Sequence, residues 1–114
     1  MKNTQGIRNI KNAHLGLEIT CLTVDLKHSM FATSSAGVIF VWDYESFKLI
    51  SAGTNEYEEV HKMEFIYPFM ALVSLDSSSQ IVFWSLANIN AFQFLHPLAK
   101  INLISPKNRH LNCN

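Results

Sequence analysis

The sequence predicts an all-β chain made of antiparallel, four-stranded blades of an incomplete propeller, and two observations predict this fold. Residues 32–43 are echoed 42 residues later by residues 74–85, so that Trp84 repeats Trp42. Repeats of about 40–45 residues built from short strands are typical of propeller blades. The strands that end at these two tryptophans are also apolar on both faces. Such strands must be covered on both sides, as they are when blades stack.

The first repeat contains four expected strands, at residues 18–24, 30–34, 38–42 and 47–51. Gly37 lies in the tight connection between the second and third strands, where a residue without a side chain can take a positive φ. Asp43 follows the third strand, at a turn where an aspartate can hydrogen-bond the backbone. This repeat therefore has the elements of one complete blade.

The second repeat is less regular than the first. Its first three strands are expected at residues 60–66, 69–75 and 80–85. Either residues 91–95 or residues 100–104 could form its fourth strand, with Pro97 between them. The pattern predicts no amphipathic helix anywhere in the chain.

Composition narrows the setting and the partners. The chain has 114 residues, of which 48% are hydrophobic and 16% charged, and its formal net charge is zero. A neutral chain lacks the basic footprint that nucleic-acid binding needs. The two cysteines, Cys21 and Cys113, make no disulfide framework, the first residues lack the apolar core of a signal peptide, and the longest apolar run is too short to span a membrane. We therefore expect a cytoplasmic protein with neither nucleic-acid nor membrane partners.

The sequence offers no catalytic, cofactor-binding or metal site. The five histidines lack metal-ligand spacing and have no Cys-x-x-Cys beside them: His14, His28, His61, His96 and His110. The chain contains neither a Gly-x-Ser-x-Gly nucleophile elbow nor a glycine-rich phosphate loop. Trp42 and Trp84 end apolar strands, so packing between blades explains them better than ligand stacking. We expect a protein that is not an enzyme.

These segments resemble the WD-repeat family. The run GVIFVWD, preceded by MFATSS and followed by FKLISAG, is similar to the last three strands of such a repeat, and EITCLTVD is similar to its first strand. His14 lies near the place of the family's Gly-His histidine, although Ala13 precedes it. The resemblance implies a set of repeat-signature residues, which are His14, Gly37, Trp42, Asp43 and Trp84.

The resemblance also divides the chain. It implies an outer strand of a preceding blade or an N-terminal extension at residues 1–13, and a WD-like blade at 14–54. A second, degenerate blade would follow at 55–104, and a polar tail at 105–114. The wording of the strong repeat is faintly similar to the large multi-propeller WD proteins of cilia and flagella, which suggests a cytoskeletal or ciliary location.

Both repeats depart from the family pattern at one position. In the family, an aspartate between the second and third strands bonds the Gly-His histidine of the same blade. Counting back six residues from each tryptophan gives Ala36 and Ser78, while Asp76 comes two positions early. The second repeat also lacks a Gly-His pair. These departures put the family's hydrogen-bonded tetrad in question for both blades.

Two blades cannot close a ring, because propellers have about 4–8 of them. We expect a fragment of a longer propeller, a truncated gene model, or a piece that completes its ring with further blades in cis or in trans. The expected function is a non-enzymatic protein–protein interaction scaffold that binds other proteins through loops at residues 25–29, 34–37 and 53–59. The alternatives are a small single-domain β-barrel that binds an apolar ligand, or a fragment without independent function that aggregates through open sheet edges.

Overall fold

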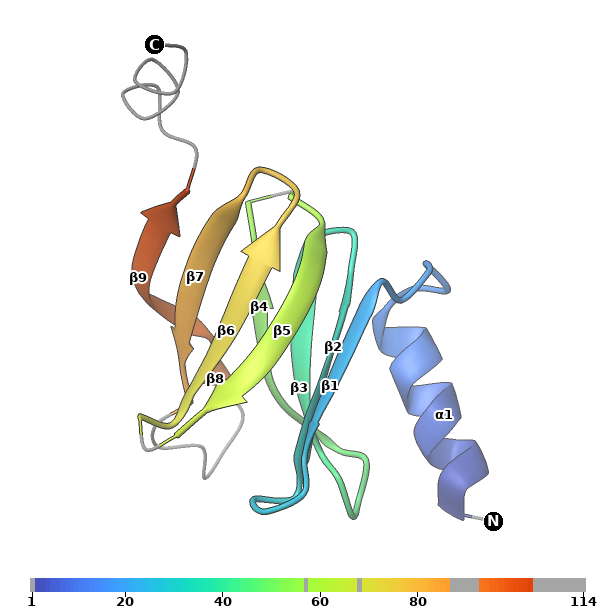
Figure 1. Ribbon diagram of the computed structural model, residues 1–114. Helices are drawn as coiled ribbons and strands as arrows, with labels where there is room; N and C mark the ends of the chain where they lie inside the picture. The colour runs from blue at the N-terminus through green and yellow to red at the C-terminus, as the bar shows by residue number, and fades with distance from the viewer. Residues whose placement is uncertain (1, 57, 68, 87–92, 104–114) are drawn as a thin grey trace, which may run out of the picture.

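The computed structural model describes residues 2–56, 58–67, 69–86 and 93–103, which form one helix and nine strands. Helix α1 (Lys2–Ala13) precedes all the strands (Figure 1). The strands are β1 (Cys21–Asp25), β2 (Met30–Ser35), β3 (Val38–Asp43), β4 (Leu49–Thr54), β5 (Val60–Ile66), β6 (Ala71–Asp76), β7 (Gln80–Ser85), β8 (Gln93–Phe94) and β9 (His96–Asn102).

The strands form two separate sheets that pack face to face (Figure 1). Blade 1 has the order β1-β2-β3-β4 and is antiparallel, with the short β8 added in parallel beside β4. Blade 2 has the order β5-β6-β7-β9 and is antiparallel throughout. The prediction of an all-β chain built from four-stranded blades is confirmed, and the sheets do not join into a barrel.

The turns inside the blades follow from local sequence. The β2–β3 connection has two residues, Ala36 with φ 48 and Gly37 with φ 78. Two successive positive φ values are the signature of a type I′ turn, whose twist matches the strands that it joins. The β6–β7 connection is longer, and Asp76 Oδ1 accepts hydrogen bonds there from the backbone N–H groups of Ser78 (2.9 Å) and Gln80 (3.0 Å).

The core lies between the two blades. Blade 1 contributes Ala32, Ile39 and Val41, each with 0% of its surface exposed. Facing side chains of blade 2 complete the same cluster: Val60, Met63, Leu72, Val82 and Trp84. Burying an aliphatic or aromatic side chain of this size stabilises a fold by about 1.5–3 kcal/mol. The two sheets therefore hold each other together through this shared layer.

Residues 2–13 are helical, so the expectation of a chain without a helix, and of an outer strand in this region, is wrong. Gly6, Ile10 and Ala13 recur at helical spacing and form the less exposed side of α1. The helix ends where Leu15 and Gly16 take φ values of 56 and 75, and where Gly16 N–H donates to the carbonyl of Lys11 (3.0 Å). Among the described residues, no helix has the length and apolar character needed to cross a membrane.

The end of the second repeat differs from both alternatives that the sequence offered. The fourth strand of blade 2 is β9, which begins at His96 and includes Pro97. Proline is tolerated there because β9 is an edge strand and its pairing with β7 is irregular at that point. Within residues 91–95, the described pair Gln93–Phe94 joins blade 1 as β8. Residue 104 and the expected polar tail at 105–114 lie outside the described residues.

Candidate interaction surface

A buried hydrogen-bond network ties the segment after α1 to blade 1. His14 is 3% exposed, and its Nε2 and Nδ1 atoms are each 2.6 Å from a hydroxyl oxygen, Oγ1 of Thr33 and Oγ of Ser35. Trp42 Nε1–H donates to the same Thr33 Oγ1 at 2.9 Å. The edge of the His14 ring meets the ring of Phe40, with centroids 4.8 Å apart. Burial lowers the pKa of His14, which favours the neutral imidazole.

Blade 1 therefore retains a four-membered network although it lacks the aspartate that the family pattern places in the turn. Ser35 occupies the place of that aspartate, two residues after Thr33 and on the same face of β2. A hydroxyl can donate or accept, so it can pair with either tautomer of a neutral histidine. The count from Trp42 pointed to Ala36 and missed this neighbour.

Blade 2 has a related arrangement, and the aspartate that seemed misplaced takes part in it. Trp84 Nε1–H donates to Ser74 Oγ (2.9 Å), and Asn55 Nδ2 donates to Asp76 Oδ2 (3.0 Å) and to the carbonyl of Glu58 (3.1 Å). Ser74 and Asp76 have the same spacing as Thr33 and Ser35. The count failed because ten residues separate Trp84 from Ser74, whereas nine separate the equivalent pair in blade 1.

The five signature residues do not lie at one place. His14 and Trp42 meet in the network of blade 1, and Trp84 lies in that of blade 2. Gly37 is in the β2–β3 turn, where its carbonyl accepts from Asn55 N–H (2.6 Å). Asp43 ends β3, and its Oδ2 accepts from Ser46 N–H (2.8 Å) and Oγ–H (2.7 Å), bonds that lower the pKa of Asp43. All five have structural positions and form no reaction centre.

Loops from both blades meet at one end of the molecule. His28, in the β1–β2 turn, stacks on Tyr67 of the β5–β6 turn with ring centroids 4.5 Å apart. Asp25 positions His28, because its two carboxylate oxygens lie 3.3 Å from the His28 backbone N and 3.2 Å from Nδ1. Beside this pair, Leu26 is 69% exposed and Phe69 is 75% exposed. We call Leu26, His28, Tyr67 and Phe69 the end patch.

The other two loops expected to make contacts present less surface. In residues 34–37, Ser34 and Ser35 are 0% and 2% exposed, since they take part in the packing of blade 1. In residues 53–59, Asn55 is 3% exposed, and the exposed Glu56 pairs with Lys100 Nζ of β9. Of the three predicted loops, residues 25–29 therefore offer the best contact surface.

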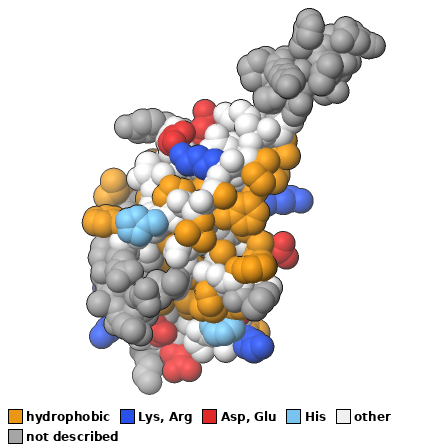
Figure 2. All heavy atoms as spheres, turned by 90° about the vertical axis from the view of Figure 1, so that its left-hand side faces the viewer, with side chains coloured by type: hydrophobic (Ala, Val, Ile, Leu, Met, Phe, Trp, Pro, Cys, Tyr) orange, Lys and Arg blue, Asp and Glu red, His pale blue; other side chains and the backbone are white. Residues whose placement is uncertain are grey.

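The outer side of blade 2 is apolar and uncovered. The register of β6, β7 and β9 places two rows of side chains on that side, Leu75, Ile81 and Ile101 in one row and Val73, Phe83 and Ala99 in the next. We call these six residues the open face. A hollow of about 340 Å³ at one end of it is lined by Phe83 and Ala99 together with Ile66, Phe69, Ala71 and Leu98. Figure 2, seen from the β9 side, shows hydrophobic side chains gathered over this part of the molecule.

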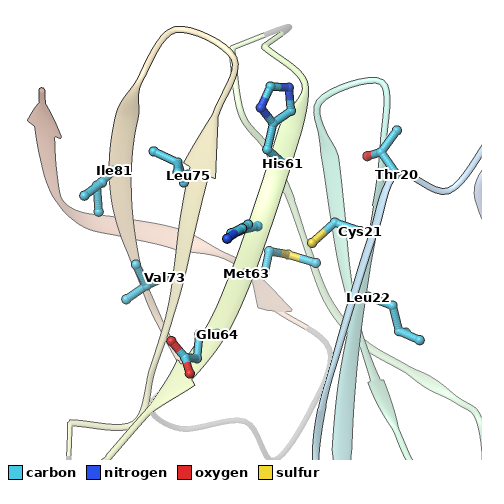
Figure 3. Close-up of a pocket in the computed structure, with 10 residues that line it drawn as sticks. Thr20, Cys21, Leu22, His61, Met63, Glu64, Val73, Leu75 and Ile81 are labelled. Carbon is cyan, nitrogen blue, oxygen red and sulfur yellow. The ribbon is translucent and has the colours of Figure 1, made fainter. Parts of the chain in front are cut away.

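A larger pocket of about 670 Å³ lies at the other end of the open face (Figure 3). Val73, Leu75 and Ile81 line it on the side of β6 and β7, and Cys21 lines it on the side of β1. Burial raises the pKa of the Cys21 thiol, so it is not an activated nucleophile. The described part of the chain contains no group of three or more His, Cys, Asp or Glu side chains that could hold a metal ion.

Comparison with known proteins identifies the fold. No protein-family model and no curated protein sequence matches the chain. Among solved structures, a chain of the mitotic checkpoint complex aligns with a TM-score of 0.63 at 11% identity, over 76% of this chain and 27% of that one. Hsv2 of Kluyvelomyces marxianus aligns with a TM-score of 0.65 at 17% identity, over 79% of this chain and 30% of that one. The computationally designed protein Ika8 aligns with a TM-score of 0.53 at 22% identity, over 64% and 22%.

These likenesses show the fold of propeller blades, and the resemblance to WD-repeat propellers is confirmed at that level. The chain spans less than a third of the length of each of the three structures. Their descriptions do not mention cilia or flagella.

Proposed function

We propose that the chain is a non-enzymatic, cytoplasmic scaffold for protein–protein interaction that forms part of a larger WD-repeat propeller. The observation that carries the proposal is the end patch, an exposed surface built jointly by loops of two blades that share one core. Loops held by a rigid scaffold are the usual place for binding residues in such folds. The likeness to a chain of the mitotic checkpoint complex, which is an assembly of proteins, supports protein partners.

The end patch has the features of a contact surface for another protein. Its aromatic rings are held by stacking between blades, so little side-chain entropy remains to be lost on binding. Large apolar side chains stand next to these rings and would become buried on contact: Leu26 and Phe69. Aromatic side chains with apolar neighbours are enriched at the centres of protein interfaces. The expected partner therefore presents an apolar side chain to this patch.

The proposal is tested by comparing the proteins that cross-link to the wild-type chain and to a Leu26→Asp, Phe69→Asp variant. Proteins that use the end patch are lost from the variant, because a carboxylate would have to be desolvated at the contact. The control is Ser78→Asp, which adds a carboxylate in the β6–β7 turn at the other end of blade 2 (Figure 1). Capture of the same proteins in the same amounts by all three chains would overturn the proposal.

A further inference from the structure

The open face of blade 2 repeats the face of blade 1 that blade 2 covers. Ala32, Ile39 and Val41 of blade 1 are each 0% exposed beneath blade 2. The corresponding positions of the open face are Val73, Ile81 and Phe83, and all three are only half-buried. The chain therefore contains, in its own core, the template for what would cover the open face.

The surface that serves as that cover also occurs twice. Blade 2 covers blade 1 with a face that includes Leu72, Ser74 and Trp84. The corresponding face of blade 1 bears Phe31, Thr33 and Trp42, on the side away from blade 2. We call this second surface the capped face, because the N-terminal segment covers part of it.

Helix α1 and the residues after it stand where a blade would stand on the capped face. A Cβ atom added at Gly6 would overlap the ring of Phe47, so the backbone of α1 rests directly on this side chain. The Phe47 ring in turn meets Phe31 edge-on, with centroids 5.5 Å apart. The cover is incomplete, since Leu22 and Val24 of β1 point to the same side and are 61% and 46% exposed.

We propose that the open face of blade 2 is the docking surface for the capped face of a second copy of this chain, and that α1 blocks this contact while it stays in place. The contact is head-to-tail, because each copy offers a different face. Two to four copies would supply the four to eight blades, roughly, that propeller rings contain. This inference rests on the proposed function for its propeller geometry, and it adds the partner.

The first test moves α1 without removing it. Gly6→Leu places a side chain where the Phe47 ring lies and raises helix propensity, so α1 remains helical but shifts away from the capped face. We expect this variant to sediment at twice the monomer mass or more at concentrations where the wild-type chain is monomeric. The matched control is Arg8→Leu, which adds the same side chain at an exposed position of the same helix and leaves the chain monomeric.

The second test separates docking from nonspecific aggregation. Ile81→Lys places a charge in the middle of the open face, so the double variant Gly6→Leu, Ile81→Lys returns to monomer, whereas Gly6→Leu with Leu26→Lys does not. The double variant offers an available capped face, and the wild-type chain offers an open face. Mixing these two monomers must therefore give a heterodimer that grows no further.

The outcomes are distinct. A folded Gly6→Leu variant that stays monomeric, or self-association that Ile81→Lys leaves unchanged, overturns the docking proposal. If Gly6→Leu loses its native tryptophan fluorescence, the test passes to the heterodimer measured with an Arg8→Leu, Ile81→Lys chain as control, which must not bind the wild-type chain. Failure here leaves capture by the end patch unaffected, because Leu26 and Phe69 lie outside the open face. The two proposals therefore fail separately.

Discussion

Replacing Thr33 by valine tests whether the network of blade 1 contributes to stability. The substitution keeps the branched shape but removes the hydroxyl that bonds Trp42 Nε1 at 2.9 Å and His14 Nε2 at 2.6 Å. Both partners are nearly inaccessible to water, with exposures of 2% and 3%. Each buried group left without a partner costs about 1–3 kcal/mol, so the expected loss in free energy of unfolding is about 2–6 kcal/mol.

The equivalent substitution in blade 2 gives an internal standard. Ser74→Ala leaves the indole N–H of Trp84 without its acceptor, and the expected cost is about 1–3 kcal/mol. Thr23→Val on β1 is the matched control, because its hydroxyl lies outside both networks, and it should change stability by less than about 0.5 kcal/mol. The three free energies are measured by urea unfolding at a pH well above 6.5, where His14 is neutral in both states.

The comparison can refute the reasoning directly. If Thr33→Val costs no more than Ser74→Ala, the bond between Thr33 and His14 adds nothing to the bond between Thr33 and Trp42. If both substitutions match the Thr23→Val control, the indole N–H groups find other partners. A change in the urea dependence of the unfolding free energy would indicate that the variant alters the unfolded state and cannot be compared.

Three further predictions concern other parts of the same packing. Because burial lowers the pKa of His14, stability is complete above about pH 6.5 and falls by up to about 1.4 kcal/mol per pH unit as pH drops toward the lower folded pKa; His14→Gln removes this slope in unfolding curves measured across that range. Asp76→Ala, which removes the acceptor of Asn55 and of two turn N–H groups, lowers the unfolding free energy by about 2–4 kcal/mol, and a value near that of Asp43→Ala would contradict its role. Gly53→Ala places a Cβ 2.9 Å from Leu95 Cβ and costs about 1–3 kcal/mol in thermal unfolding, unless Leu95 moves freely.

The blades could be predicted because their signal is local and repeated. The apolar strands ending at Trp42 and Trp84 state the period, and β3 and β7 begin where the sequence places them, at Val38 and Gln80. Helix α1 gave a weak signal, since its buried side consists of a glycine, a half-buried isoleucine and an alanine among polar residues. Its position depends on the fit of Gly6 against Phe47, a contact over 41 residues of sequence that no local pattern encodes.

The hydrogen-bond networks were hidden by a difference in turn length. Counting from a tryptophan assumes the same number of residues in each turn, and blade 2 has one more than blade 1. Counting along β6 from Ser74 would have placed Asp76 correctly, since two residues along a strand return to the same face. The place of Ser35 follows from the same rule applied to Thr33. Asn55 had no signal of its own, because its role depends on how the loop before β5 packs.

Strand β8 has a consequence for the order in which the chain assembles. It pairs with β4 across 42 residues, through Ser51 and Gln93, and Leu95 N–H then donates to the carbonyl of Ala52 (2.8 Å). The chain reaches β9 only after this contact, so the last strand of blade 2 is delivered from the edge of blade 1. During synthesis the N-terminal half must therefore form its sheet first, and the second sheet closes against it at the end. The molecule is completed in one direction, from the first blade to the last strand.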